Sequence, residues 1–238
     1  MGAAMPYVVV GFYTPNYAEI ADQFRSNLQS HAIPHHLYAV DRIGETWIAE
    51  TLRKPSIVLE AMGDYPDKTI ILMDVDCSVT GHLGPLMSDA DVSVHMIHRR
   101  LKSSRACSRV VVFRPTPAAR SLAALWKELC DEQIDRVRTM RLTCRQSRKL
   151  AVDDEVLLLK ALLSSPGLTI KQLPIEHVGI GAGATAPLVT HASAHDQFAP
   201  PAKLLPAAKA SLKSARRRIV EVIVGQPYEQ WKYGGWSR

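Results

Sequence analysis

Two aspartates separated by one residue follow a short apolar segment. Asp74 and Asp76 come directly after residues 69–73, TIILM, whose apolar and β-branched composition is typical of a buried strand. Both carboxylates are therefore expected at the carboxyl end of that strand. Two hard oxygen ligands at this spacing suit Mn²⁺ or Mg²⁺, which usually leave other positions for water and substrate phosphates. An aspartate after a strand also commonly caps a turn, so the pair alone leaves both interpretations open.

A second group of carboxylates opens an apolar segment later in the chain. Asp153, Asp154 and Glu155 precede residues 156–163, VLLLKALL, whose composition predicts a buried helix. Carboxylates are favoured at the positive N-terminal end of a helix. Helix capping is therefore the simplest interpretation of this group.

The segments that must position these residues alternate between strand and helix patterns. Residues 7–13, YVVVGFY, form a continuous apolar run that predicts a buried strand, and a helical apolar face follows from Tyr17, with Asn16 as its expected N-cap. We also expect strands over 36–40, 69–73, 91–97 and 109–113, and helices over 55–62, 116–131 and 156–163. Strands that alternate with helices predict parallel pairing, helices on both faces of the sheet, and ligands bound beyond the carboxyl ends of the strands.

The composition limits the classes of protein to consider. The chain has 238 residues, 47% of them hydrophobic and 22% charged, which fits one large domain with an appendage and excludes disorder throughout. No segment approaches the roughly 20 apolar residues of a membrane span, and the opening residues have no secretory pattern, so we expect a cytoplasmic location. The net charge of +6 suits a phosphorylated or polyanionic ligand without identifying it. The four cysteines form no CxxC pair, which indicates reduced thiols and no zinc site.

Several short segments, in a fixed order, resemble the bacterial nucleotide-diphospho-sugar transferases of the GT-A type. They are YVVVGFYTPNY, Trp47 with Lys54-Pro55 (W-x6-KP), IILMDVDC, VVVFRPTPAARSLAALW, DDEVLLLKAL and LVTHASA, and together they span roughly residues 7 to 195. The resemblance implies an α/β fold with a GT-A-like, Rossmann-type mixed sheet flanked by helices over residues 1–198. A basic, aromatic-ended C-terminal extension over 199–238 would follow. The implied activity is metal-dependent transfer of a sugar from a nucleotide-diphosphate donor to an unknown acceptor.

The resemblance also implies roles for particular residues on the donor side. Gly11, Phe12, Tyr13 and Thr14 would line the base and ribose of the donor, although Tyr13 could equally be a core residue. Lys54 and Arg114 would add positive charge near the phosphates, with a solvated lysine and a strand-end arginine as the commoner alternatives.

A metal centre and a catalytic pair are implied as well. Asp74 and Asp76, with Asp74 also facing the donor, would hold Mn²⁺ or Mg²⁺ together with His191, for which His195 is the competing choice. Asp153 and Asp154 would face the sugar or the acceptor as the catalytic carboxylates. Related retaining enzymes tend to have Asp-Gln where this chain has Asp154-Glu155, so the stereochemical outcome stays open.

Two other functions compete with sugar transfer. A strand followed by DxD also resembles the phosphoaspartate phosphatases, in which Asp74 would be the nucleophile, Lys149 the later lysine and Asp153-Asp154 the acidic pair. A nucleic-acid-binding protein could use the basic segment between Arg136 and Lys149, but its cations are not interleaved with aromatic residues, so we expect no nucleic-acid partner. The glycines at 179, 181 and 183 lack the following helix of a dinucleotide-binding motif and indicate a loop.

The C-terminal extension combines cations with apolar and aromatic residues. Arg216-Arg217-Arg218 precedes the apolar run 219–224, and Tyr228, Trp231, Tyr233 and Trp236 end the chain. This pattern suits a peripheral contact with the anionic inner face of a membrane, which a lipid-linked acceptor would make useful. It also suits an apolar segment that packs on the domain while its cations are solvated.

Overall fold

The computed structural model describes residues 6–44, 47–99, 102–140, 142, 146–147, 150–178 and 188–191. The glycines at 179, 181 and 183, His195, Lys149 and the extension 199–238 lie outside this part of the chain. Among the described residues, no helix is both long and apolar enough to cross a membrane.

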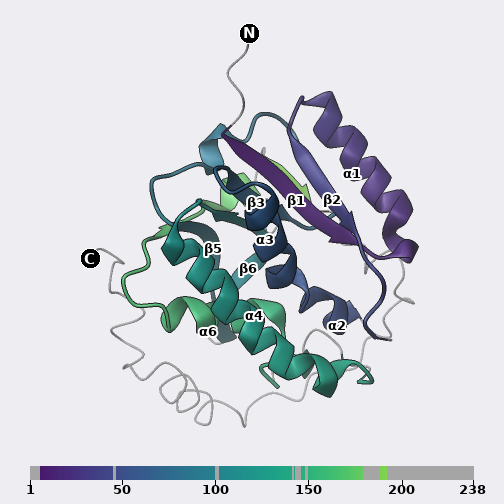
Figure 1. Ribbon diagram of the computed structural model, residues 1–238, viewed down its shortest axis with the longest axis vertical. Coiled ribbons are helices and arrows are strands. Elements are labelled where there is room, and N and C mark those ends of the chain that lie inside the picture. Colours follow the sequence, from purple (N-terminus) through teal and green to yellow (C-terminus); the bar gives the residue numbers. More distant parts are fainter. Residues whose placement is uncertain are drawn as a thin grey trace.

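The elements follow one another in a mixed order of strands and helices (Figure 1). The strands are β1 (Tyr7–Tyr13), β2 (His35–Ala39), β3 (Thr69–Met73), β4 (Cys77–Val79), β5 (Val92–Arg99), β6 (Lys102–Phe113), β7 (Ile170–Gln172) and β8 (Val189–His191). The helices are α1 (Ala18–Ser30), α2 (Trp47–Thr51), α3 (Lys54–Asp64), α4 (Pro117–Val137), α6 (Asp154–Leu163) and α7 (Ile175–Val178), with short 3-10 turns over Pro15–Tyr17 and Gly84–Leu86.

Six of these strands form one mixed sheet in the order β2-β1-β3-β6-β5-β7. β1 pairs in parallel with β2 and β3, as the alternating pattern predicts, and β5 pairs in parallel with β7. β6, which lies between β3 and β5, runs antiparallel to both. β4 and β8 form a separate antiparallel pair. The expected mixed sheet flanked by helices is therefore confirmed.

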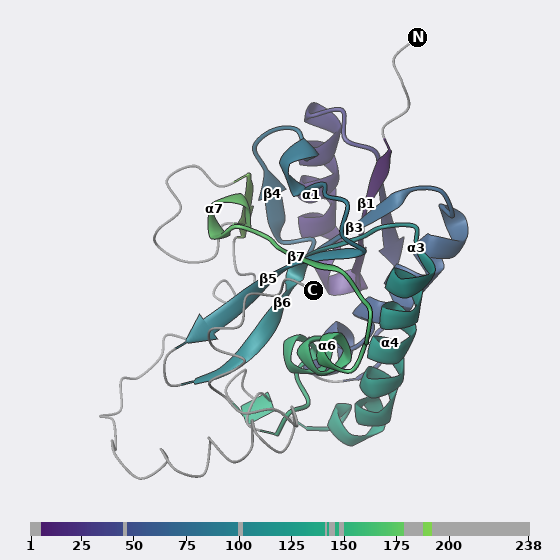
Figure 2. The same ribbon diagram turned by 90° about the vertical axis from the view of Figure 1, so that its left-hand side faces the viewer.

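The side chains of the central strands alternate between two apolar cores. Val8, Ile70 and Val111 face the core beneath α3, α4 and α6, and Val9 and Ile71 face the core beneath α1 and β4. This alternation follows from the two-residue period of a strand, and burial on both faces explains why β1 and β3 are apolar throughout. Figure 2 shows α3 and α4 on one side of the sheet and α1 with β4 on the other, while β5 and β6 extend together beyond these layers.

Three boundaries differ from the sequence-based expectation. β6 begins at Lys102 rather than at residue 109, because its polar first half is held by pairing with β5 and has no apolar pattern to reveal it. α4 continues to Val137 rather than ending at residue 131, so Arg136, the first cation of the basic segment, belongs to this helix. Asn16 lies in the 3-10 turn and does not cap α1, whose N-cap is Tyr17.

Candidate functional site

A pocket of about 470 Å³ lies beyond the carboxyl ends of β1 and β3. Four aromatic side chains line it, those of Phe12, Tyr13, Tyr17 and Trp47, together with polar residues from four segments: Thr14, Asn16, Arg42, Glu50, Thr51, Lys54, Asp74 and Asp76. Phe12, Tyr13 and Thr14 leave β1 at this edge, which is where a parallel arrangement of strands is expected to bind a ligand. The residues predicted to hold the donor are thus brought together, with the exception of Gly11.

Gly11 does not line the pocket but sets the spacing of the strands beneath it. A Cβ atom at this position would lie 2.7 Å from the carbonyl oxygen of Met73 and 3.4 Å from side-chain atoms of Leu37 and Val75. Met73 is the last residue of β3 and directly precedes Asp74. The missing side chain of Gly11 therefore lets the backbone of β1 approach the end of β3 closely.

Asp74 and Asp76 stand on the wall of this pocket. A turn in which the Cys77 amide donates to the Asp74 carbonyl, at 3.0 Å, follows β3 and brings both carboxylates to the same edge. Burial raises the pKa of Asp74, the nearby ammonium of Lys54 lowers it, and the carboxylate of Asp76 raises it, so that the net pKa is above the usual range. The pKa of Tyr17 is also raised, chiefly by burial and to a smaller extent by the charges of Asp76 and Asp74. Negative charge is thus concentrated at this end of the pocket.

Lys54 joins this negative charge to the acidic start of α6. Its Nζ lies 2.8 Å from Asp74 Oδ1 and 3.1 Å from Asp154 Oδ2, and it donates to Ser108 Oγ at 2.9 Å. The side chain is 4% exposed, so the alternative of a solvated lysine is wrong. Burial lowers the pKa of Lys54, but the carboxylates of Asp154 and Asp74 outweigh it and raise the pKa above its ordinary value. The two carboxylates therefore stabilise the charged form of Lys54.

The local sequence explains how Lys54 reaches this position. Trp47 begins α2 and Lys54 begins α3, where Pro55 is tolerated because the first turn of a helix needs no amide donor there. The contact between Lys54 and Asp74 shows that the start of α3 lies next to the end of β3. The two ends of the motif W-x6-KP thus both line the pocket: Trp47 at the start of α2 and Lys54 at the start of α3.

The three carboxylates at the start of α6 have different surroundings. Asp153 is the N-cap of α6: its Oδ1 accepts from the Glu155 amide at 3.2 Å and its Oδ2 accepts from Ser147 Oγ at 3.2 Å, so the capping interpretation is confirmed for this residue. Asp154, 3% exposed, accepts from Ser108 Oγ at 2.5 Å as well as from Lys54. Glu155 forms an ion pair with Arg105 at 2.8 Å. The catalytic roles of Asp153 and Asp154 stay predictions.

The pairing of β4 with β8 brings the backbone of His191 close to the segment that carries Asp74 and Asp76. His191 is opposite Cys77, the residue that follows Asp76, in this antiparallel pair. The structure describes the backbone of His191 alone. Among the described side chains, no three from His, Cys, Asp and Glu converge into a complete ligand set.

The chemistry of the donor set nevertheless fits a divalent cation. Asp74 and Asp76 supply carboxylate oxygens to the lining of one pocket. Burial and the like charge of Asp76 raise the pKa of Asp74, an effect that a bound cation would counteract. Oxygen ligands from aspartate suit Mg²⁺ and Mn²⁺, and an imidazole from the neighbouring strand suits Mn²⁺. Mn²⁺ or Mg²⁺ therefore stays a prediction that these residues support.

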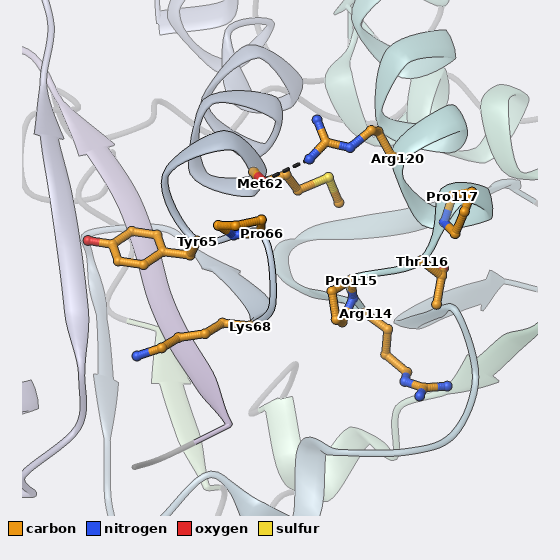
Figure 3. A pocket seen from close by; sticks show the side chains of 9 residues that line it. All are labelled: Met62, Tyr65, Pro66, Lys68, Arg114, Pro115, Thr116, Pro117 and Arg120. Carbon is orange, nitrogen blue, oxygen red and sulfur yellow. Dashed lines mark hydrogen bonds between the residues drawn. The ribbon is translucent and has the colours of Figure 1, made fainter.

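Arg114 does not lie near the predicted phosphate site. It lines a second hollow of about 240 Å³ between the end of α3 and the start of α4, with Tyr65, Lys68 and Arg120 among its neighbours (Figure 3). Because β6 runs antiparallel to β3, Arg114 follows β6 at the end of the sheet where β3 begins, opposite to Asp74. Figure 3 shows Arg114 and Lys68 pointing away from one another, while Arg120 donates to the Met62 carbonyl at 2.7 Å. The expectation that Arg114 contributes charge near the donor phosphates is wrong.

Several residues of the site were not predicted from the sequence. Arg105, Ser108 and Arg109 belong to the polar part of β6 that precedes its apolar residues, so no local signal marks them. Tyr17 was expected to face the core as part of a helical stripe; it packs partly against the core beneath α1 and also lines the pocket. The signal that could have predicted this pocket position is that Tyr17 lies just after the end of β1, where ligands are expected to bind.

Comparisons with known proteins identify the fold. No model of a protein family matches the chain, and no curated protein sequence matches it. Among solved structures, it is similar to a glycosyltransferase involved in the glycosylation of the major capsid of PBCV-1, with a TM-score of 0.53 and 13% identity over 78% of this chain and 92% of the other. It is also similar to the glycosyltransferase GlyE of Streptococcus pneumoniae TIGR4, with a TM-score of 0.50 and 12% identity over 99% of this chain and 66% of the other. The chain therefore has a GT-A-like glycosyltransferase fold.

Proposed function

We propose that this protein is a glycosyltransferase that uses a nucleotide-diphosphate sugar and a divalent cation. The observation that carries the proposal is the aromatic pocket at the ends of β1 and β3, which has Asp74 and Asp76 on its wall. Glycosyltransferases with the same fold support it. Both the resemblance of the sequence and the geometry of the pocket favour this function over the phosphatase alternative.

The pocket residues divide naturally between the parts of such a donor. Phe12, Tyr13, Tyr17 and Trp47 offer aromatic faces on which a nucleobase can stack. Thr14 and Asn16, whose side chains are 2.8 Å apart, offer polar groups to a ribose. Asp74 and Asp76 with His191 would hold the cation, which when bound would neutralise the diphosphate leaving group.

The Lys54 network would orient the reacting end of the site. Lys54 fixes Asp74 on one side and Asp154 on the other, so the carboxylates predicted for metal binding and catalysis are held by one cation. Such preorganised charges are effective because they need no rearrangement during the reaction. Asp154 would then lie nearest to the sugar among the carboxylates of α6, while Asp153 supports the helix start.

The proposal is tested by binding of nucleotide diphosphates with and without Mn²⁺, measured by thermal shift and calorimetry. We expect one of UDP, GDP, ADP and CDP to bind more than tenfold tighter with Mn²⁺, and Asp76→Asn to remove this gain. Asp67→Asn, an exposed aspartate in the turn before β3, is the matched control and should keep it. Failure of every nucleotide to bind would contradict the proposal, and binding of phosphate mimics alone would favour the phosphatase.

A second measurement addresses catalysis separately from binding. Asp154→Asn should leave nucleotide affinity within about twofold and lower donor hydrolysis or sugar transfer about a hundredfold, the scale of a lost acid-base group. Full activity of this variant would return Asp154 to a structural role.

A further inference from the structure

β6 contains an irregularity beside the end of β3. Val111 pairs with Val94 of β5, but the next pair along the hairpin is Cys107 with His95, so Ser108, Arg109 and Val110 have no partner residue on β5. On the other side, Val110 pairs with Met73, and the Asp74 amide donates to the Arg109 carbonyl at 3.0 Å. β-bulges commonly occur next to active sites, where they redirect a side chain. This bulge places Ser108 and Arg109 directly beside Asp74.

Three basic side chains lie near the carboxylates of Asp74, Asp154 and Glu155, and they differ in whether they form ion pairs. Lys54 contacts Asp74, Asp154 and Ser108, and Arg105 is paired with Glu155. Arg109 is half-buried, and among the described residues its guanidinium has neither a hydrogen bond nor an ion pair within bonding distance. An arginine keeps its charge at all relevant pH values and offers five donors, so the half-buried guanidinium of Arg109 has donors left for a ligand.

The charge of Arg109 lies close to the carboxylates of Glu155 and Asp74. Burial lowers the pKa of Arg109, but the neighbouring Cys107, Glu155 and Asp74 outweigh this effect and raise it. Arg109 does not line the aromatic pocket, whose walls come from β1, β3 and the segments between them. It lies on β6, the next strand of the sheet beyond β3. Its position is therefore on the side of Asp74 that faces away from the proposed nucleotide site.

We propose that Arg109 binds a carboxylate or phosphate group on a sugar, so that this enzyme handles an anionic sugar either as the transferred residue or as the acceptor. This inference rests on the proposed function. A guanidinium matches carboxylate and phosphate oxygens bidentately, which gives both affinity and orientation. A neutral sugar would leave these donors without an anionic partner, and a site built to bond a polar group discriminates strongly against a substrate that lacks it.

Two arms of one experiment distinguish the transferred sugar from the acceptor. In the first, calorimetry with Mn²⁺ compares a nucleotide hexose with the corresponding hexuronate, for example UDP-glucose with UDP-glucuronate, using the base selected by the nucleotide screen. In the second, NMR titration of the protein loaded with the nucleoside diphosphate compares glucose with glucuronate and glucose 6-phosphate. We expect the charged member to bind at least tenfold tighter in one arm.

Arg109→Gln should abolish this preference while the affinity for the nucleoside diphosphate stays within twofold, and Arg109→Lys should keep part of the preference. Arg114→Gln, a cation at the opposite end of β3, should keep all of it. Wild-type protein that binds the nucleotide without preferring a charged sugar in either arm would overturn the inference, as would a preference that survives in Arg109→Gln. Failure of the nucleotide itself to bind would instead overturn the proposed function, and this inference with it.

Discussion

Asp74 and Asp154 are joined through one ammonium group. The two aspartates belong to the end of β3 and the first turn of α6, and the Nζ of Lys54 lies 2.8 Å from one and 3.1 Å from the other. Ser108 completes the cluster from β6. Three segments of the fold thus meet at one buried cation, and the stability of the core and the proposed chemistry depend on the same residues.

Lys54→Met should be strongly destabilising. Removing the ammonium leaves Asp154 and Asp74 without their cation, and breaking a buried ion pair from one side costs about 3 to 5 kcal/mol. The free energy of unfolding, measured with urea at pH 7, should fall by that amount. Lys127→Met, which removes the exposed ion pair with Asp131, should cost no more than about 0.5 kcal/mol. A loss below about 1 kcal/mol for Lys54→Met would show that Asp154 does not need this partner.

Ser108→Ala tests the same cluster from β6. Ser108 donates to a carboxylate and accepts from an ammonium, and a hydrogen bond to a charged group contributes about 1.5 to 3 kcal/mol. We expect a loss of stability in that range and a decrease in sugar transfer, because Asp154 loses one of the groups that orient it. Ser88→Ala is the control, since the bonding partners of Ser88 are neutral groups, the hydroxyl of Ser93 and the amide of Ala90. Equal losses for the two variants would argue against a charged network.

The local pattern of the chain was enough to predict the apolar strands β1 and β3 and the DxD pair. β1 and β3 are continuous apolar runs, and Asp74 and Asp76 follow β3 in a turn, so strand composition and turn chemistry indicated both the strand and its polar end. The capping role of Asp153 was predictable for the same reason. These features could be predicted because they depend only on residues that are close together in the sequence.

The partners of these residues could not be predicted in the same way. Lys54, Ser108 and Asp154 meet only because α3, β6 and α6 pack together, and nothing in a single segment encodes that contact. The antiparallel β5–β6 hairpin and its bulge depend on register between strands, which leaves no periodic signal around Arg109. Arg114 was misplaced because its position depends on the antiparallel direction of β6.

Gly11→Ala should disturb the junction of β1 and β3. The new methyl group would lie 2.7 Å from the Met73 carbonyl, which is a backbone atom and cannot move aside without shifting β3. We expect a loss of about 1 to 3 kcal/mol in the free energy of unfolding and weaker nucleotide binding, because Asp74 follows Met73 directly. Gly63→Ala is the control: no atom lies within 4 Å of its added methyl, and alanine in α3 should stabilise by up to about 1 kcal/mol. Unchanged stability of Gly11→Ala would show that the strands can separate without cost.

Asp91 should make the stability of the fold dependent on pH in the acidic range. Its Oδ2 accepts from the amide and hydroxyl of Thr169, at 2.9 and 2.6 Å, and its Oδ1 accepts from Thr116 Oγ1 at 2.8 Å. Thr116 is the N-cap of α4, so Asp91 ties the start of β5 to that helix and to the segment before β7. Burial raises the pKa of Asp91, but the hydrogen bonds from Thr169 and Thr116 and the charge of Arg114 outweigh it and lower the pKa below its ordinary value.

A carboxylate whose pKa is lower in the folded state stabilises the fold fully above its unfolded pKa, about 3.9, and the contribution is lost as the pH falls through the folded value. The difference in unfolding free energy between the wild type and Asp91→Asn should therefore be about 1 kcal/mol and constant from pH 7 to 5, and it should shrink below about pH 4. Urea titrations at each pH measure it. Thr169→Val removes one donor, so the wild type and this variant should also converge in acid. A difference that grows as the pH falls would mean that the folded state raises the pKa of Asp91 instead of lowering it.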